Sequence, residues 1–154
     1  MEKILVWDTR QQSGKHDHIL SWFEKHNYKI VRNKLFCGDV TYLQNMSVCI
    51  DTKKDILEVV GNVTQQHLRF TNEIDRAVEN GIRLVFLIQD ENVTCLDDLD
   101  HWINPRRRYS EKAVKGYMLK KILKTIEERH QTKFYFCKKD ECAETIIKIL
   151  DGEM

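Results

Sequence analysis

The sequence has one proline and no long apolar run, and these absences limit what the chain can be. Pro105 is the single proline among 154 residues, so few positions force a helix or strand to break. No segment approaches the roughly 20 consecutive apolar residues of a membrane-spanning helix. The first apolar run, residues 4–7, meets an acid at Asp8, too early for a signal peptide. We therefore expect a cytoplasmic protein with no membrane partner.

The cysteine content argues against a disulfide framework. Five cysteines are an odd number, and three of them lie inside apolar runs, as reduced and buried thiols do. Cys137 and Cys142 have four residues between them, and no second pair completes a zinc site. The five are Cys37, Cys49, Cys95, Cys137 and Cys142.

Common catalytic patterns are missing as well. The chain has no nucleophile elbow, no metal-ligand histidine pair and no glycine-rich phosphate loop, so a small-molecule hydrolase has little support. His16 and His18 flank Asp17 near a helix start, where we expect the aspartate to assist the N-terminus and the histidines to face solvent. Trp22, Phe23 and Trp102 are expected in the core.

Charge is unevenly distributed although the net charge is only +1. Residues 104–124 hold a strongly basic stretch with a single acid, Glu111. Such a stretch is typical of a surface that binds a polyanion, and a solvated basic helix has the same composition. Its basic residues are Arg106, Arg107, Arg108, Lys112, Lys115, Lys120, Lys121 and Lys124.

Strand-like and helix-like segments alternate along the chain, without repeats or a linker, which predicts one α/β domain over residues 1–154 with a mixed central sheet. Residues 83–88 are continuously apolar, as in a central strand covered on both faces. Strands are expected at 4–7, 28–31, 34–37, 46–53, 83–88 and 133–137. Helices are expected at 15–26, 54–60 (closed by Gly61), 64–79, 109–130 and 140–150.

Three aspartates stand on or beside predicted strands, where open α/β sheets place their sites. Asp8 closes the first strand, Asp39 follows Gly38 at the end of another, and Asp51 lies inside a third. Asp51 and Lys53 are two residues apart, so on a strand they project from the same face.

This residue set suits metal-assisted hydrolysis of a phosphodiester. Asp39 and Asp51 offer the hard oxygen ligands that Mg²⁺ or Mn²⁺ prefers. The ion would activate water and offset charge on the phosphate, and Lys53 would orient that water or stabilise the transition state. By composition alone, an exposed salt bridge between Asp51 and Lys53 is an open alternative.

The same residues carry a resemblance to a known family. Residues 6–11 (Val-Trp-Asp-Thr-Arg-Gln) resemble the Val-Asp-x-Arg-Glu opening of the XPF-type nucleases, a branch of the PD-(D/E)XK superfamily. Gly38-Asp39 resembles their Gly-Asp-Tyr element, and residues 50–53 (Ile-Asp-Thr-Lys) resemble their Glu-Arg-Lys element. Order and spacing match over residues 4–90, and residues 104–154 resemble the tail of small stand-alone bacterial and phage relatives.

The resemblance implies a restriction-endonuclease-like three-layer α/β fold. It also implies a Mg²⁺- or Mn²⁺-dependent endonuclease, encoded by a bacterium or phage, that cuts branched, flapped or recombining DNA. Asp8, Asp39, Asp51 and Lys53 fall on the family's catalytic acids and lysine, and the three aspartates become the expected metal ligands. A homodimer is expected by analogy.

DNA contacts follow from the same resemblance. Arg10 matches the arginine of the first motif, and Arg69 lies where the family often has a basic residue on the following helix. Gln65 and Gln66 come one turn earlier and are expected to face the site. Three arginines after Pro105 are expected to contact phosphates. They are Arg106, Arg107 and Arg108.

Departures from the family pattern support a second hypothesis. Gln11 replaces a glutamate, Val40 an aromatic residue, Asp51 a glutamate and Thr52 an arginine. The chain is also too short for the paired helix-hairpin-helix module of many relatives. The alternative is a catalytically impaired protein of the same fold that binds DNA or a protein partner.

Overall fold

The computed structural model describes residues 3–10, 14 and 16–154. Within them, six strands form one mixed sheet in the order β2-β1-β3-β4-β5-β6. The strands are β1 (Ile4–Trp7), β2 (Lys29–Arg32), β3 (Val40–Tyr42), β4 (Val48–Lys53), β5 (Arg83–Gln89) and β6 (Phe134–Cys137). The helices are α1 (Asp17–Lys25), α2 (Ile56–Thr64), α3 (His67–Glu79), α4 (Gly116–Arg129) and α5 (Cys142–Leu150), with short 3₁₀ turns η1 (Leu96–His101), η2 (Pro105–Arg108) and η3 (Lys139–Glu141).

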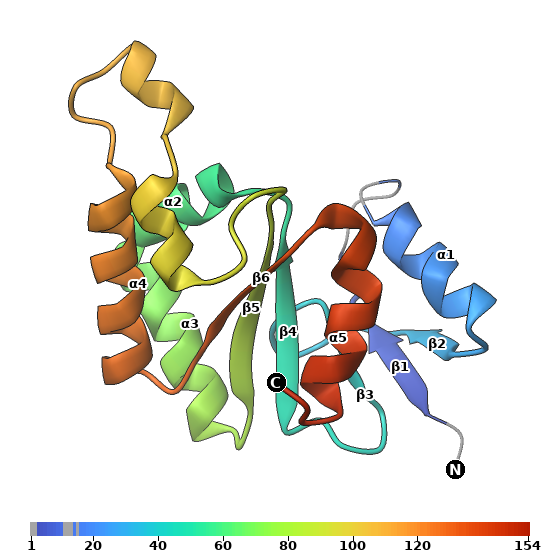
Figure 1. The fold of residues 1–154 in the computed structure, drawn as a ribbon. Helices are drawn as coiled ribbons and strands as arrows, with labels where there is room; N and C mark the ends of the chain where they lie inside the picture. Colours follow the sequence, from blue (N-terminus) through green and yellow to red (C-terminus); the bar gives the residue numbers. More distant parts are fainter. Residues whose placement is uncertain (1–2, 11–13, 15) are drawn as a thin grey trace.

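The sheet is the middle of three layers, as the sequence predicted. Strands β4, β5 and β6 run parallel, β3 lies antiparallel to both β1 and β4, and β2 lies parallel to β1 at the edge. Helices α2, α3 and α4 cover one face, and α1 and α5 cover the other (Figure 1). The α/β fold with a mixed central sheet is therefore confirmed.

Strand β4 shows how the sequence assigns side chains to the two faces. Ile50 packs in the core beneath α1 and α5, whereas Cys49 packs in the core beneath α2, α3 and α4. Because side chains alternate along a strand, Asp51 and Lys53 belong to the same face as Cys49. The predicted pairing of these two residues on one face is confirmed.

The strand expected at 34–37 was wrong. Those residues form an irregular turn, and β3 begins only after Asp39. Gly38 explains the difference, since its φ of 73° is a left-handed conformation that favours glycine. A Cβ on Gly38 would also lie 2.8 Å from the Cys49 sulfur. The chain therefore turns sharply before Asp39 and presents it at the start of a strand.

The helices expected at 54–60 and 109–130 had the largest errors in their bounds. Helix α2 continues through Gly61 to Thr64, because Val60 and Val63 extend its buried face. Helix α4 starts only at Gly116, seven residues later than expected at residue 109. Gly116 packs so closely on η1 that a Cβ there would overlap the carbonyl oxygen of Leu99. Residues 103–115 precede it and project beyond the sheet (Figure 1).

The aromatic and histidine predictions had mixed outcomes. Phe23 is fully buried, and Trp22 and Trp102 are partly buried against the cores, as expected. The histidines do not both face solvent, which corrects that prediction. His16 is buried edge-on against Trp7, with ring centroids 5.3 Å apart, and burial lowers the pKa of His18.

The cysteines are free thiols, as predicted. Cys49, Cys137 and Cys142 are buried, Cys37 is half-buried and Cys95 is exposed. In the described part of the chain, no helix is long and apolar enough to cross a membrane.

Candidate active site

Lys53 lies at the end of β4, between two carboxylates. Its ammonium nitrogen is 3.4 Å from Oδ1 of Asp51 and 3.9 Å from Oε1 of Glu58. It also lies 5.7 Å from the centroid of the Phe86 ring, a cation–π contact. Only 10% of the Lys53 side chain is exposed. The exposed salt bridge that composition left open therefore does not describe this pair.

Asp39 is buried and oriented by Thr52. Its Oδ2 accepts hydrogen bonds from both the backbone N–H and the hydroxyl of Thr52, each at 2.7 Å. Its own backbone N–H donates to the carbonyl oxygen of Ile50 at 2.8 Å. Thr52 stands where the family pattern has an arginine, and here it fixes the carboxylate that precedes it by thirteen positions.

The charge of Asp39 acts on Asp51. Burial, then repulsion from Asp39, raises the pKa of Asp51 from 3.8 to about 7, although Lys53 opposes the shift. The negative charges of Asp39 and Asp51 repel each other, and a bound cation would offset this repulsion. Their hard oxygen atoms fit Mg²⁺ or Mn²⁺, which proteins often hold with one or two carboxylates plus water and phosphate oxygens.

Asp8 lies one strand away and is occupied by other partners. Its Oδ1 accepts the backbone N–H of Leu35 at 2.8 Å, and its Oδ2 is 3.0 Å from Nε of Arg10. Its backbone N–H donates to the carbonyl oxygen of Asp39 at 2.8 Å. Asp8 therefore fixes the position of Arg10 and stabilises the turn that leads into Asp39.

Glu58 and Asp55 were missed by sequence reasoning. Asp55 caps α2 by accepting the backbone N–H of Glu58 at 2.9 Å, and this places the Glu58 side chain beside Lys53. The spacing Asp-x-x-Glu before an apolar run is the signature of a helix start and could have indicated it. Asn62, one turn further along α2, has a buried Oδ1 with no hydrogen-bond partner in the described structure.

A groove of about 290 Å³ lies beside Asp8 and Asp39. Phe36 contributes an aromatic side chain that is 58% exposed. The hydrogen bond with Cys49 lowers the pKa of Cys37, although burial and the charge of Asp51 oppose this shift. Because Arg10 is 3.0 Å from Asp8 and Gly38 directly precedes Asp39, the groove is close to these two carboxylates. Its lining residues are Arg10, Phe36, Cys37, Gly38, Glu73 and Arg76.

The expected DNA-contacting residues occupy separate places. Arg69 lies on α3, with its side chain 76% exposed and 3.8 Å from Glu73. Gln65 ends α2 and lines a second groove, of about 310 Å³, together with Arg106. Arg107 instead donates to the carbonyl oxygens of two residues in its own loop. Gln65 and Arg106 thus line the same groove, whereas Arg69 lines a different one on α3.

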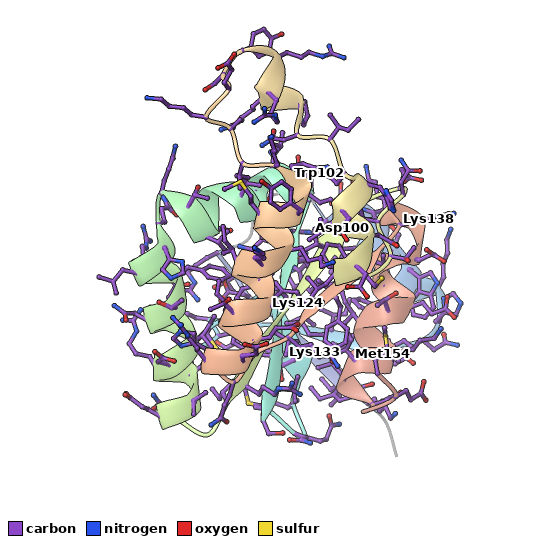
Figure 2. All side chains as sticks on the ribbon, turned by 60° about the vertical axis from the view of Figure 1, so that its left-hand side comes forward. Asp100, Trp102, Lys124, Lys133, Lys138 and Met154 are labelled. Atoms are coloured by element: carbon purple, nitrogen blue, oxygen red, sulfur yellow. The ribbon has the colours of Figure 1, made fainter. Side chains whose placement is uncertain are left out.

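The basic stretch divides into two parts. Lys120 and Lys124 on α4 pair with the acids of η1, at 2.7 Å from Lys120 to Asp100 and 3.1 Å from Lys124 to Asp97. Asp100 and Lys124 lie on the same side of the molecule in Figure 2. Lys120 and Lys124 are therefore paired with acids, whereas the cations of the loop before α4 are exposed. These are Arg106, Arg108, Lys112 and Lys115.

The described residues do not provide the full set of metal ligands that the family pattern predicts. Gln11, the residue that replaces a family glutamate, lies outside the described residues. Among the described residues, no group of three or more His, Cys, Asp and Glu side chains is arranged to hold a metal ion. Of the three aspartates expected as metal ligands, Asp39 and Asp51 interact with each other. Asp8 is instead bonded to Leu35 and Arg10.

The described residues form a three-layer α/β fold with a mixed six-stranded sheet, and this fold is similar to that of the XPF nuclease domain. Two solved structures of XPF from Aeropyrum pernix, one of them in complex with DNA, are similar to this chain, with TM-scores of 0.65 and 0.68 at 13% and 14% identity. They cover 98% and 99% of this chain, which in turn spans 61% and 65% of theirs. No protein-family model and no curated protein matches the sequence. The resemblance to XPF-type nucleases is confirmed as a likeness of fold.

Proposed function

We propose that this protein is a Mg²⁺- or Mn²⁺-dependent endonuclease that hydrolyses phosphodiester bonds in DNA. The observation that carries the proposal is the partly buried cluster at the end of β4. There Asp51 has a pKa of about 7 beside Asp39, and the Lys53 ammonium is 3.4 Å from Asp51. Strongly shifted carboxylates with a specific charged partner are typical of catalytic sites. The DNA-bound neighbour of the same fold supports DNA as the substrate.

Each residue has a distinct role in the proposed mechanism. Asp39 and Asp51 would hold the ion, which when bound activates water and offsets charge on the phosphate. Thr52 keeps the Asp39 carboxylate oriented through its two hydrogen bonds. Lys53 holds the attacking water or the developing phosphate charge, and Asp8 assists by positioning Arg10.

The finer points of the function are extensions by analogy. Branched, flapped or recombining DNA is the proposed substrate, with the whole chain acting as one nuclease domain and as a homodimer. The proposed DNA contacts are Arg10, Gln65, Arg69, Arg106, Arg107 and Arg108. The cytoplasmic location of the protein, and its origin in a bacterium or a phage, stay predictions.

A panel of labelled DNA substrates tests the proposal. We expect the protein to cut at least one of flap, fork, four-way junction and linear DNA with Mg²⁺ or Mn²⁺, and to lose this activity with a chelator. Asp39→Asn should abolish cutting, because a neutral amide holds the ion poorly. Asp55→Asn is the matched control, since Asp55 only caps α2 and asparagine caps equally well.

The alternative, a non-catalytic DNA-binding protein, makes the opposite prediction. Folded protein that binds DNA equally well with and without chelator, and cuts none of these substrates, would favour it. Gln11 would then be the residue to examine first, by restoring the glutamate of the family motif.

Binding of the metal ion is expected to depend on pH through Asp51. With a pKa of about 7, this carboxyl is protonated in acid, and a bound ion must displace that proton. The affinity for Mn²⁺ should fall about tenfold for each pH unit below about 7 and become constant above about pH 8. Calorimetric titrations in buffers of different ionisation heat measure both the affinity and the released proton. A flat affinity between about pH 5.5 and 8.5 would contradict the role of Asp51.

A further inference from the structure

We propose that residues 103–115, here called the arm, bind unpaired nucleotides at a branch in DNA, with Tyr109 stacking on a base. The arm joins η1 to α4 and projects beyond the sheet, at the top of Figure 1. The proposal rests on the nuclease function proposed above and names the feature of the substrate that the protein reads.

Polar contacts, not an apolar core, hold the arm in shape. Asn104 is 1% exposed, and its amide nitrogen donates to the carbonyl oxygen of Val114 at 2.9 Å, which closes the base of the arm. Its Oδ1 accepts the backbone N–H of Arg106 at 2.9 Å and starts the turn η2. Arg107 donates to the carbonyl oxygens of Glu111 and Ala113, both at 2.9 Å. The arm is thus organised before any ligand binds, which lowers the entropic cost of binding.

The arm exposes two large apolar side chains that do not pack against the rest of the protein. Tyr109 is 88% exposed and Ile103 is 83% exposed. The arm also carries exposed cations, against the single acid Glu111. The exposed cations are Arg106, Arg108, Lys112 and Lys115.

This combination matches single-stranded nucleic acid better than other partners. An exposed aromatic ring between cations can stack on a base while the cations hold the neighbouring phosphates. Bases in an intact duplex are stacked on each other, so Tyr109 finds a free base face only at flaps, forks and ends. A second copy of the arm would be repelled by like charge, and two isolated apolar side chains offer little area to a protein.

The arm is placed to act together with the carboxylates. Its basal residues Arg106 and Lys112 line the groove of about 310 Å³ that Gln65 borders at the far end of α2. Helix α2 begins next to Lys53 and has nine residues. At 1.5 Å per residue it spans roughly 13 Å. One strand of DNA covers that distance in about four nucleotides.

Binding measured without cleavage tests the proposal. Fluorescence titrations in chelator would use a flap DNA with 2-aminopurine in its unpaired segment, and a linear duplex of the same sequence. We expect Tyr109→Ala to weaken flap binding about tenfold, to leave duplex binding within about twofold, and to abolish quenching of the 2-aminopurine. Tyr109→Phe should keep wild-type binding and quenching. Tyr117→Ala, a half-exposed tyrosine on α4, is the matched control and should change neither.

The outcomes separate this proposal from the nuclease function. Selective loss of flap binding in Tyr109→Ala supports the arm even if the wild type cuts no DNA. Unchanged flap binding, equal loss on flap and duplex, or no DNA binding by the wild type overturns it, whether or not the wild type is a nuclease. Because Tyr109 is almost fully exposed, its variants should melt at the wild-type temperature, which circular dichroism checks.

Discussion

Replacing Asp51 with asparagine is expected to reduce DNA cleavage about 1000-fold or more and, at the same time, to stabilise the metal-free protein. The two effects have one cause. The folded protein confines the Asp51 carboxylate beside Asp39, with 22% of the Asp51 side chain exposed. Asparagine has nearly the same shape but neither repels Asp39 nor holds a divalent ion.

The sign of the stability change follows from the direction of the pKa shift. Between pH 3.8 and about 7 the unfolded chain has released the Asp51 proton while the folded chain still holds it. Stability therefore falls as pH rises through this range, and the loss persists above it. At about pH 8, Asp51→Asn should raise the free energy of unfolding by about 2 kcal/mol after allowance for partial exposure.

Chemical denaturation with and without Mn²⁺ measures this effect. The wild type should gain stability from the ion, and Asp51→Asn should not. Asp55→Asn serves as the control, because the Asp55 side chain only accepts the backbone N–H of Glu58, and asparagine can accept the same hydrogen bond. A variant at position 51 that is both less stable and still active would show that Asp51 has a structural role only.

The second large effect is expected at Lys53. Lys53→Met keeps the length of the aliphatic stem and its packing near Phe86 but removes the ammonium group. We expect cleavage to fall about 100- to 1000-fold, the usual loss when one charge-stabilising donor is removed. The pKa of Asp51 should also rise further, because Lys53 is the group that lowers it most.

Varying the pH separates these two consequences of Lys53→Met. Raising the pH to about 9 should restore Mn²⁺ binding, since Asp51 is then ionised again. Cleavage should stay low if Lys53 acts on the water or the phosphate. Lys54→Met, at the exposed neighbouring position, should match the wild type. Full recovery of cleavage at high pH would mean that Lys53 acts only through the ionisation of Asp51.

The sequence was informative wherever the relevant interaction is local. The alternation of residues along β4 was enough to predict that Asp51 and Lys53 share a face. The continuous apolar run of β5 was enough to predict a central strand, and the alternation of elements to predict a mixed α/β sheet. These signals depend on neighbours within a few positions of the chain.

Interactions between distant segments were not predicted. The two hydrogen bonds from Thr52 to Asp39 require the strands to be paired first, so the sequence indicated a departure from the family pattern and not its role. The left-handed conformation of Gly38 changed an expected strand into a turn. Composition alone identified the basic stretch. It could not show that two of its lysines, Lys120 and Lys124, form ion pairs with Asp100 and Asp97 of η1.

The backbone bonds around Asp39 link the active site to folding itself. Asp39 donates to Ile50 and accepts from Asp8, so its peptide groups join the two neighbouring strands. Segments that are far apart along the chain must therefore assemble before the carboxylates meet, and such non-local pairing forms slowly. Local opening that lets the Asp8 and Asp39 amides exchange with deuterium also separates Asp39 from Asp51, the two proposed metal ligands. If the proposed nuclease function holds, the opening free energy measured by exchange at these amides should equal the free energy that separates the active from the inactive protein. A nascent or partly unfolded chain would then not cut DNA.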